Sequence, residues 1–480
     1  MDATAPTVTA AEQAGGFALP VPEGGAQRQA VGWLALGLGA LVLSGLFAVL
    51  IVLSRTPFLQ DRVPFVDFFH TALVVHVDLS VLVWFLAFAG VLWSLNAARR
   101  GAAFGWLGLG LAVAGAVVMS AAPFLAAGNP LMSNYVPILQ QPQFLAGLAL
   151  FGLGFGALVL RAMFFVPPVG MAVSGAGALR FGLNTAVAAA AMALLALAWT
   201  WAGMPDHLQG QAYYEVLFWG GGHVLQFTHT HLMLVAWLWL ATACGAPPRI
   251  RPRVVLFLFA WGLLAVFATP LIYLSTDVAS PGHRALFTWQ MEFGGSLASL
   301  FIGLAVLDGL WRHRDAAVAR PERAALVASL ILFGAGGLIG FFIRGSNVII
   351  PAHYHGCIVG VTLAFMGMTY HLLPRLGFDA VNPRLGAWQA WIYGGGQLMH
   401  IVGLAWSGGY GVQRKIAGAA QGLDSAERVV AMGLMGLGGL IAVIGGVLFL
   451  VAVFAAIHRG RRRGAAGPGR DRLRRRSERS

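Results

Sequence analysis

The sequence predicts an all-α, polytopic membrane protein with twelve transmembrane helices. Of its 480 residues, 58% are hydrophobic and only 10% are charged, whereas soluble proteins carry roughly 25% charged residues. Apolar runs recur along the chain, and each is long enough, at about 1.5 Å per residue, to cross much of a bilayer. The predicted spans are 31–54, 66–96, 103–126, 143–166, 181–203, 213–244, 253–274, 284–311, 323–343, 350–373, 387–407 and 428–457.

The two ends of the chain differ from its apolar middle. Residues 1–30 are rich in Ala, Gly and Pro and lack the basic start and short apolar core of a signal peptide, so we expect a disordered cytoplasmic segment. Residues 31–457 form the predicted transmembrane domain, and residues 458–480 form a basic cytoplasmic tail. Because ten arginines of this tail account for much of the net charge of +13, no nucleic-acid partner is expected.

Basic residues in the loops predict the orientation of the helices. The loops after even-numbered helices contain Arg99, Arg100, Arg161, Arg180, Arg249, Arg251, Arg253, Arg312, Arg314, Arg320, Arg323, Arg375 and Arg384. The other loops contain fewer basic residues, namely Arg55, Arg62, Arg284, Arg344, Arg414, Lys415 and Arg428. Since cytoplasmic loops carry the excess of Lys and Arg, we expect both termini to lie in the cytoplasm.

Histidines gather in the outer parts of four predicted helices. His76 lies in the second helix, His223 in the sixth, His283 at the mouth of the eighth, and His353 and His355 at the start of the tenth. Ionisable groups at membrane depth are costly unless they face a cavity, one another or a cofactor. Their gathering therefore indicates a cofactor site. A histidine-lined transporter would explain neither this clustering nor the His-x-His spacing.

The spacing of His353 and His355 suits two different cofactors. Residues i and i+2 of an α-helix are separated by about 200° around the axis, so the two imidazoles leave opposite sides of the helix. His355 with His76 suits a low-spin heme, which needs a histidine on each face. His353 suits a five-coordinate heme with an open face. His223 and His283 suit a second metal, because imidazole binds copper and iron alike.

Three motifs then carry a family resemblance. They are His353-x-His355 with its continuation Tyr370 to Leu376, Trp219-Gly-Gly-Gly-His223, and His76 to Val81. With them, roughly residues 31–457 resemble the catalytic subunit of the heme-copper oxidases, especially the C-type cytochrome c oxidases and nitric oxide reductases. The resemblance implies a subunit I-like bundle with two hemes, expected to be of b type, and one non-heme metal, copper or iron.

The resemblance also implies a role for each residue. His76 and His355 would bind the low-spin heme and His353 the high-spin heme. His223 and His283 would bind the second metal. The pair Arg414 and Lys415 would neutralise the heme propionates, which are carboxylates near the outer interface.

A respiratory oxidoreductase of the bacterial inner membrane is the function that the resemblance implies. Electrons would pass from a periplasmic carrier through the low-spin heme to the high-spin heme and metal, where O2 is reduced to water. Reduction of nitric oxide to nitrous oxide is the alternative. The two cysteines, Cys244 and Cys357, cannot form a copper loop or attach a c-type heme. A cytochrome c, a cupredoxin-like donor or a second subunit is therefore the expected partner, besides membrane lipid.

One departure from the family pattern affects the predicted metal site. The family usually has adjacent histidines before the eighth helix, whereas this chain has His283-Arg284, and a guanidinium cannot ligate a metal. Alternative third ligands are Gln226, Glu215 and Glu292. Loss of the metal would favour another interpretation, a non-catalytic heme-binding membrane sensor.

Two further departures concern tyrosine and lysine. The places where the family has a redox tyrosine hold Phe227 and Phe287, with Tyr273 and Tyr354 as alternatives. Reduction of nitric oxide needs no such tyrosine, so this departure favours that reaction. Lys415 is the one lysine of the chain, so the membrane-embedded lysine that some relatives use for proton uptake is missing. We therefore expect weak or absent proton pumping.

Overall fold

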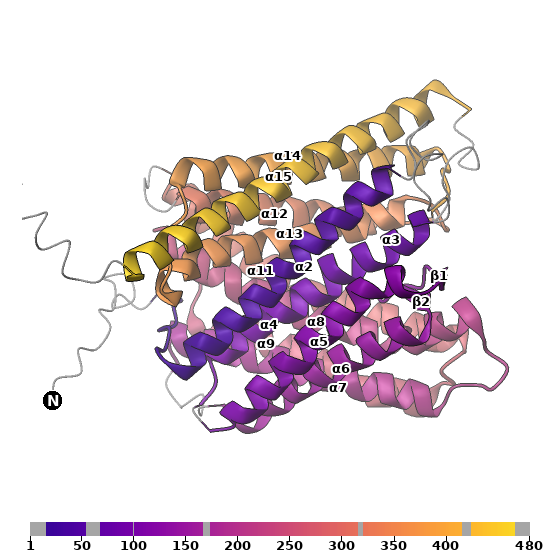
Figure 1. Ribbon diagram of the computed structural model, residues 1–480, viewed down its shortest axis with the longest axis horizontal. Helices are drawn as coiled ribbons and strands as arrows, with labels where there is room; N and C mark the ends of the chain where they lie inside the picture. The colour runs from indigo at the N-terminus through magenta and orange to yellow at the C-terminus, as the bar shows by residue number, and fades with distance from the viewer. Residues whose placement is uncertain are drawn as a thin grey trace, which may run out of the picture. The chain divides into compact units, whose positions relative to one another are not determined.

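The computed structural model describes residues 16–53, 68–98, 100–166, 173–314, 320–414 and 424–465. The chain forms two compact units, the first of residues 1–242 and 246–314 and the second of residues 243–245 and 315–480. Both are built from long helices (Figure 1). Helices suit a membrane because each satisfies its own backbone hydrogen bonds without water.

The first unit holds eight of the predicted spans. Its helices are α2 (Gly25–Leu53), α3 (Phe68–Val77), α4 (Trp84–Leu95), α5 (Ala102–Leu125), α6 (Pro142–Phe164), α7 (Gly175–Ala202), α8 (Gly210–Ala243), α9 (Pro252–Val266), α10 (Thr269–Ser275) and α11 (Pro281–Arg312). The π-helical stretch η1 (Asp78–Val83) joins α3 to α4 into the second predicted span. The seventh span is made of α9 and α10. Thr269 and Pro270 begin α10, where proline at the first helical turn is tolerated.

A short β-hairpin interrupts the helical pattern of the first unit. Strands β1 (Asn129–Leu131) and β2 (Ile138–Gln140) pair antiparallel between α5 and α6. The sequence does not indicate these strands, because three-residue strands leave too little alternation to detect. The loop at the tip of this hairpin contributes to the candidate site.

The second unit holds four long helices. They are α12 (Arg320–Gly340), α13 (Ile349–Leu372), α14 (Pro383–Gly409) and α15 (Ala426–Ala465), and the short 3-10 helix η2 (Leu373–Leu376) follows α13. Helix α14 packs against α12, α13 and α15, and Figure 1 shows α14 and α15 lying side by side. Asn382 caps α14 by accepting hydrogen bonds from the backbone N–H groups of Arg384 and Leu385.

The helices confirm the predicted fold class. Within the described residues, eleven segments are long and apolar enough to cross a membrane. Helix α14, with 27 residues, is the eleventh predicted span and is not among these eleven segments. The first span begins at Gly25 rather than at the predicted residue 31, and α15 continues to Ala465. Residues 1–15 and 466–480, parts of the two predicted terminal segments, lie outside the described residues.

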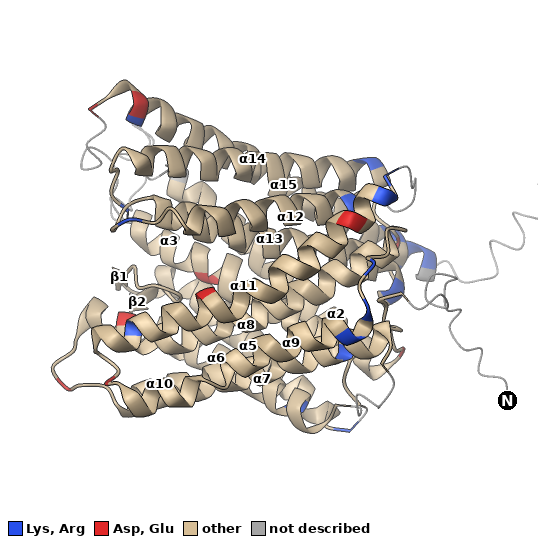
Figure 2. Ribbon diagram, turned by 180° about the vertical axis from the view of Figure 1, so that it is seen from behind, with Lys and Arg blue, Asp and Glu red and all other residues tan. Residues whose placement is uncertain are grey.

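Basic residues gather mainly at one end of the helices within each unit taken by itself (Figure 2). In the first unit, Arg161 lies in the last turn of α6 and Arg312 in the last turn of α11. Arg28 lies near the start of α2, which runs in the opposite direction. This distribution agrees with a membrane protein whose Lys and Arg residues mark the cytoplasmic side.

Candidate functional site

His353 and His355 leave opposite sides of α13, as their spacing predicts. His353 faces α12, where its Nδ1 lies 2.7 Å from the backbone carbonyl of Gly336. His355 faces α14, where its ring centroid lies 5.1 Å from that of His400. The Nδ1 of His355 lies 2.9 Å from the carbonyl of Pro351 in its own helix. Each imidazole therefore has its own flank of the helix.

Glycines allow α12 and α13 to approach closely enough for the contact of His353. A Cβ atom added to Gly356 would lie 2.5 Å from the Cα of Gly336, so only glycine fits this crossing. A Cβ atom added to Gly340 would lie 2.9 Å from the Nδ1 of His353. The small residues of α12 thus bring its backbone carbonyl to the imidazole and leave room for the ring.

His76 is held by the neighbouring helix α2. Its Nδ1 lies 2.9 Å from the backbone carbonyl of Ser44, and the hydroxyl of Ser44 donates to the backbone carbonyl of His76 at 3.1 Å. The second span changes to π-helical geometry immediately after His76, at Asp78. Such π-helical turns occur frequently at functional sites.

His283 occupies the first turn of α11. Ser280 caps this helix by accepting a hydrogen bond from the backbone N–H of His283 at 3.1 Å. The hydroxyl of Thr276 donates to the carbonyl of Ile272, so its oxygen must accept from the Nδ1 of His283, at 3.0 Å. The side chain of His283 is buried, and its Nε2 has no hydrogen-bond partner among the described residues. A buried nitrogen with a free lone pair fits a metal ligand.

His223 lies on α8, and both nitrogens of its imidazole ring have hydrogen-bond partners. Its Nδ1 donates to the backbone carbonyl of Trp219 at 2.8 Å. The hydroxyl of Tyr135 lies beside the ring, 2.8 Å from the Nδ1 and 3.0 Å from the Nε2 of His223. Because Nδ1 carries the hydrogen, the phenol can donate only to Nε2. The rings of His223 and His283 both pack against Phe287, with centroid distances of 6.2 and 4.9 Å. The first unit thus brings His223 and His283 to one aromatic cluster.

Tyr135 comes from the tip of the β-hairpin and was missed by the sequence analysis. It has a positive φ of 68°, a conformation that costs a non-glycine residue about 1–2 kcal/mol. Asn134 beside it donates to the carboxylate of Glu215 at 2.5 Å. Burial, together with the Glu215 carboxylate, raises the pKa of the Tyr135 phenol, so it remains a donor. No sequence pattern places this loop against α8, although Gly222 next to His223 is the residue that makes room for it.

Arg284 does not join His283 at the candidate metal site. Its guanidinium carbon lies 5.7 Å from the centroid of the Trp219 ring, and its backbone carbonyl accepts a hydrogen bond from the indole N–H of Trp219 at 3.3 Å. The side chain is therefore used in a cation–π contact. This contact agrees with the expectation that Arg284 is no ligand.

One hydrogen-bonding pattern unites the five predicted ligands. In each, Nδ1 donates to a carbonyl or hydroxyl oxygen, which fixes the tautomer in which Nε2 is unprotonated. Metal-ligating histidines are held in this way by outer partners. His229 and His231, deeper in α8, differ because their Nδ1 atoms have no partner among the described residues. The donor set therefore fits hemes and a metal bound through Nε2.

The structure also places the alternative residues for the metal site. Glu292 is exposed. Glu215 lies eight residues before His223 on α8, about 12 Å along the axis, too far to share an ion. Gln226 is partly buried. Among the described residues, no group of three or more His, Cys, Asp and Glu side chains is arranged to hold a metal.

The two alternative tyrosines lie near predicted ligands. The ring of Tyr273 meets that of His283 edge-on at 4.9 Å, but its hydroxyl points to α7, donating to the carbonyl of Ala196 at 2.8 Å. Tyr354 is 41% exposed and stacks on His355. Neither hydroxyl is hydrogen-bonded to a predicted metal ligand in the described residues, in contrast to that of Tyr135.

The predicted propionate partners follow α14, and a buried carboxylate follows His76 in the second span. Arg414 is half-buried in a turn after α14, and Lys415 lies outside the described residues. Asp78, which the sequence analysis did not single out, is 1% exposed, and neither of its carboxylate oxygens has a hydrogen-bond partner among the described residues. Buried carboxylates in membrane segments mark functional positions.

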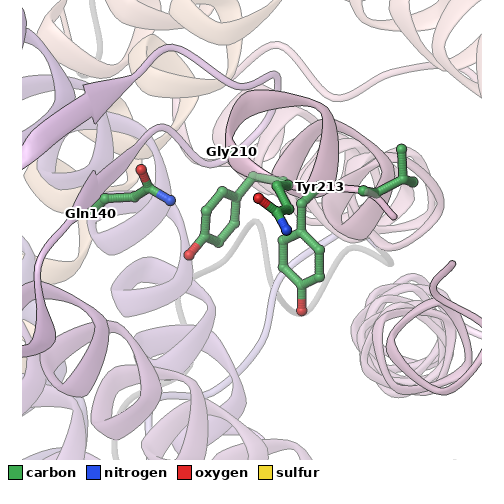
Figure 3. A pocket seen from close by; sticks show the side chains of 6 residues that line it. Gln140, Gly210 and Tyr213 are labelled. Atoms are coloured by element: carbon green, nitrogen blue, oxygen red, sulfur yellow. The ribbon is translucent and has the colours of Figure 1, made fainter. Parts of the chain in front are cut away.

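A polar cavity of about 640 Å³ lies at the start of α8 (Figure 3). Its lining residues are Gln140, Leu208, Gln209, Gly210, Tyr213 and Tyr214. None of the predicted ligands lines this cavity. It is therefore a feature separate from the histidine cluster of the first unit.

Comparisons with known proteins show the family and the fold of this chain. Residues 28–448 match the family described as cytochrome c and quinol oxidase polypeptide I. The uncharacterized protein RP382 of Rickettsia prowazekii is 28% identical, over 87% of this chain and 94% of that protein. Cytochrome c oxidase subunit 1 of Thermus thermophilus is 25% identical, over 88% of this chain and 84% of that protein. A heme-copper terminal oxidase dimer solved by cryo-EM has the same fold, with a TM-score of 0.68, 16% identity, and coverage of 91% of this chain and 84% of that one.

Proposed function

Because the chain belongs to the cytochrome c and quinol oxidase polypeptide I family, within the heme-copper oxidase superfamily, we propose that it is a respiratory terminal reductase. It takes electrons from a carrier outside the membrane and reduces O2 to water. The observation that carries this proposal is the shared pattern of the five histidines, in each of which Nδ1 is the hydrogen-bond donor and Nε2 is unprotonated.

Each histidine has a defined task in this proposal. His76 and His355 bind the low-spin heme, His353 binds the high-spin heme, and His223 with His283 bind the second metal. When bound, these groups supply the electron-transfer and gas-reducing chemistry. The protein supplies ligand orientation, through Ser44, Pro351, Gly336, Trp219 and Thr276. Arg414 and Lys415 neutralise the heme propionates.

The proposal includes a cellular setting and partners. The protein spans the bacterial inner membrane with both termini in the cytoplasm, which the gathering of basic residues at one end of each unit supports (Figure 2). A cytochrome c, a cupredoxin-like protein or a second subunit delivers electrons from the periplasm. This partner is needed because the sequence holds no copper loop and no c-heme attachment motif.

Reduction of nitric oxide to nitrous oxide is the second candidate reaction. It is favoured by Phe227 and Phe287, which stand where the family has its redox tyrosine. The hydroxyl of Tyr135 beside His223 weighs against this argument, because it supplies a phenol at the same imidazole by another route. We therefore keep O2 as the first candidate.

The test is a metal analysis combined with turnover of both gases. We expect two hemes and about one non-heme metal per purified protein, and electron transfer from reduced cytochrome c to O2, to NO or to both. The His223→Ala variant should keep both hemes but lose the metal and turnover, whereas His207→Ala, in an exposed loop, should match the wild type. A wild-type protein without heme would overturn the proposal. Unchanged turnover in His223→Ala would instead favour a heme-binding sensor.

A further inference from the structure

Two arginines near the end of α15 lie on one face of that helix, next to the start of α14. Arg459 and Arg463 are four residues apart, so their side chains are neighbours on the helix surface. Both guanidiniums meet the carboxylate of Asp379, with the Nε of Arg459 3.4 Å from Oδ2 and the Nη1 of Arg463 3.0 Å from Oδ1. The Nη2 of Arg459 also donates to the backbone carbonyl of Ala380 at 2.9 Å. One carboxylate thus holds two cations in place.

Main-chain contacts attach the loop that carries Asp379 to α15. The backbone N–H of Asp379 donates to the carbonyl of Ala456 at 3.4 Å. A Cβ atom added to Gly460 would lie 2.7 Å from the Cα of Phe378, so a larger residue at this position would push the two segments apart. The position of the two guanidiniums is therefore set by backbone packing as well as by the ion pairs.

A cavity of about 460 Å³ opens beside these arginines, within the second unit. It is lined by residues 379–383 together with Arg459 and Arg463. A guanidinium carries five N–H donors, and within the described residues the contacts with Asp379 and Ala380 use only part of them. The arginine side chains remain 43% and 79% exposed, and Asp379 supplies one negative charge against two positive charges. Donors and positive charge are therefore left for an anion.

The surroundings place this cavity at the depth of lipid headgroups. Arg459 lies two residues after the predicted apolar span 428–457. About 8 Å further into each helix, large apolar side chains are exposed, namely Phe454 on α15 and Trp388 on α14. Tryptophan is enriched where a membrane meets water. Figure 2 shows basic residues at this end of α14 and α15. A phospholipid is the anion whose phosphate and acyl chains match both surfaces.

We propose that this cavity binds the phosphate group of an anionic phospholipid, from the leaflet at the basic end of the helices. Arginine suits this ligand because its planar fork donates to two phosphate oxygens at once. Basic residues next to a membrane span also attract anionic lipids. The acyl chains then lie along the exposed apolar surfaces of α14 and α15. None of the predicted histidine ligands takes part, so this inference does not depend on the proposed function.

The experiment counts the lipids that the full-length protein retains in detergent. Phosphatidylglycerol or phosphatidylcholine is added, and bound lipid is measured by native mass spectrometry. The double variant Arg459→Gln/Arg463→Gln is compared with Arg461→Gln/Arg462→Gln. The second pair is the matched control, because it is exposed at the same end of α15 and carries the same charge but does not line the cavity. Inorganic phosphate is added as a competitor, to distinguish a lipid headgroup from free phosphate.

The expected result is one retained phosphatidylglycerol, held in preference to phosphatidylcholine, in the wild type and in the control variant. Its affinity should fall by at least about tenfold in Arg459→Gln/Arg463→Gln, because hydrogen bonds to charged groups are lost. A wild type that shows no preference for phosphatidylglycerol would overturn the inference, whether or not the variants fold. Equal losses in the two double variants would also overturn it, since general surface charge would then explain the binding. Displacement of the lipid by inorganic phosphate would instead make this a site for soluble phosphate.

Discussion

The histidines of α13 and those of α8 and α11 are held by different means. His353 and His355 rely on the backbone carbonyls of Gly336 and Pro351, which helices place at regular intervals. In contrast, His283 relies on the hydroxyl of Thr276, and His223 meets the phenol of Tyr135 in addition to a helix carbonyl. A backbone carbonyl is still present after its residue is substituted, provided that the helix still forms. A side-chain hydrogen-bond partner, in contrast, can be removed by one mutation. The second-metal site should therefore be easier to alter than the heme sites.

Replacing His353 by alanine should have the largest effect of the changes considered. The variant loses the predicted ligand of the high-spin heme, so we expect one heme fewer per protein and a turnover loss beyond the roughly 100-fold typical of outer-shell changes. Heme quantitation and gas consumption measure both. His207→Ala, in an exposed loop, is the control. Retention of both hemes in His353→Ala would show that its backbone-held ring serves another purpose.

Replacing Thr276 by valine should give an intermediate effect confined to the second metal. The change keeps the shape of the side chain but removes the oxygen that accepts from the Nδ1 of His283, so metal affinity should fall by about 10–100-fold. Metal titration of the purified protein tests this, with heme content unchanged. Thr288→Val, on the exposed side of α11, should behave as the wild type. Equal metal affinity in both variants would remove the contrast between the two kinds of support.

Replacing Arg284 by alanine should have the smallest effect. The guanidinium is exposed and lies over Trp219, where a cation–π contact contributes about 0.5–1 kcal/mol. We expect a slightly lower melting temperature, unchanged metal content and unchanged turnover. A large loss of metal in this variant would mean that Arg284 acts on the ligand set, against its position in the structure.

The regular parts of the molecule were predictable from the sequence, and the irregular parts were not. Long apolar runs defined all twelve helices, and the i, i+2 spacing placed His353 and His355 on opposite flanks of α13. The hairpin between α5 and α6 and its residue Tyr135 were missed, because their position depends on contacts across 88 residues of sequence rather than on a local period. Gly222 was visible in the sequence, but nothing local indicated which ring it accommodates. The ligand roles themselves remain predictions.

The π-helical stretch after His76 has a consequence for how this span tolerates change in length. A π-turn contains one more residue than the α-helical turn that it replaces, and it accommodates this residue while largely keeping the directions of the side chains on its two sides. If the same residues Asp78–Val83 were α-helical, His76 would be turned by about 100° relative to α4. The imidazole would then leave Ser44. The wide turn thus lets this span contain one extra residue and still direct His76 towards α2.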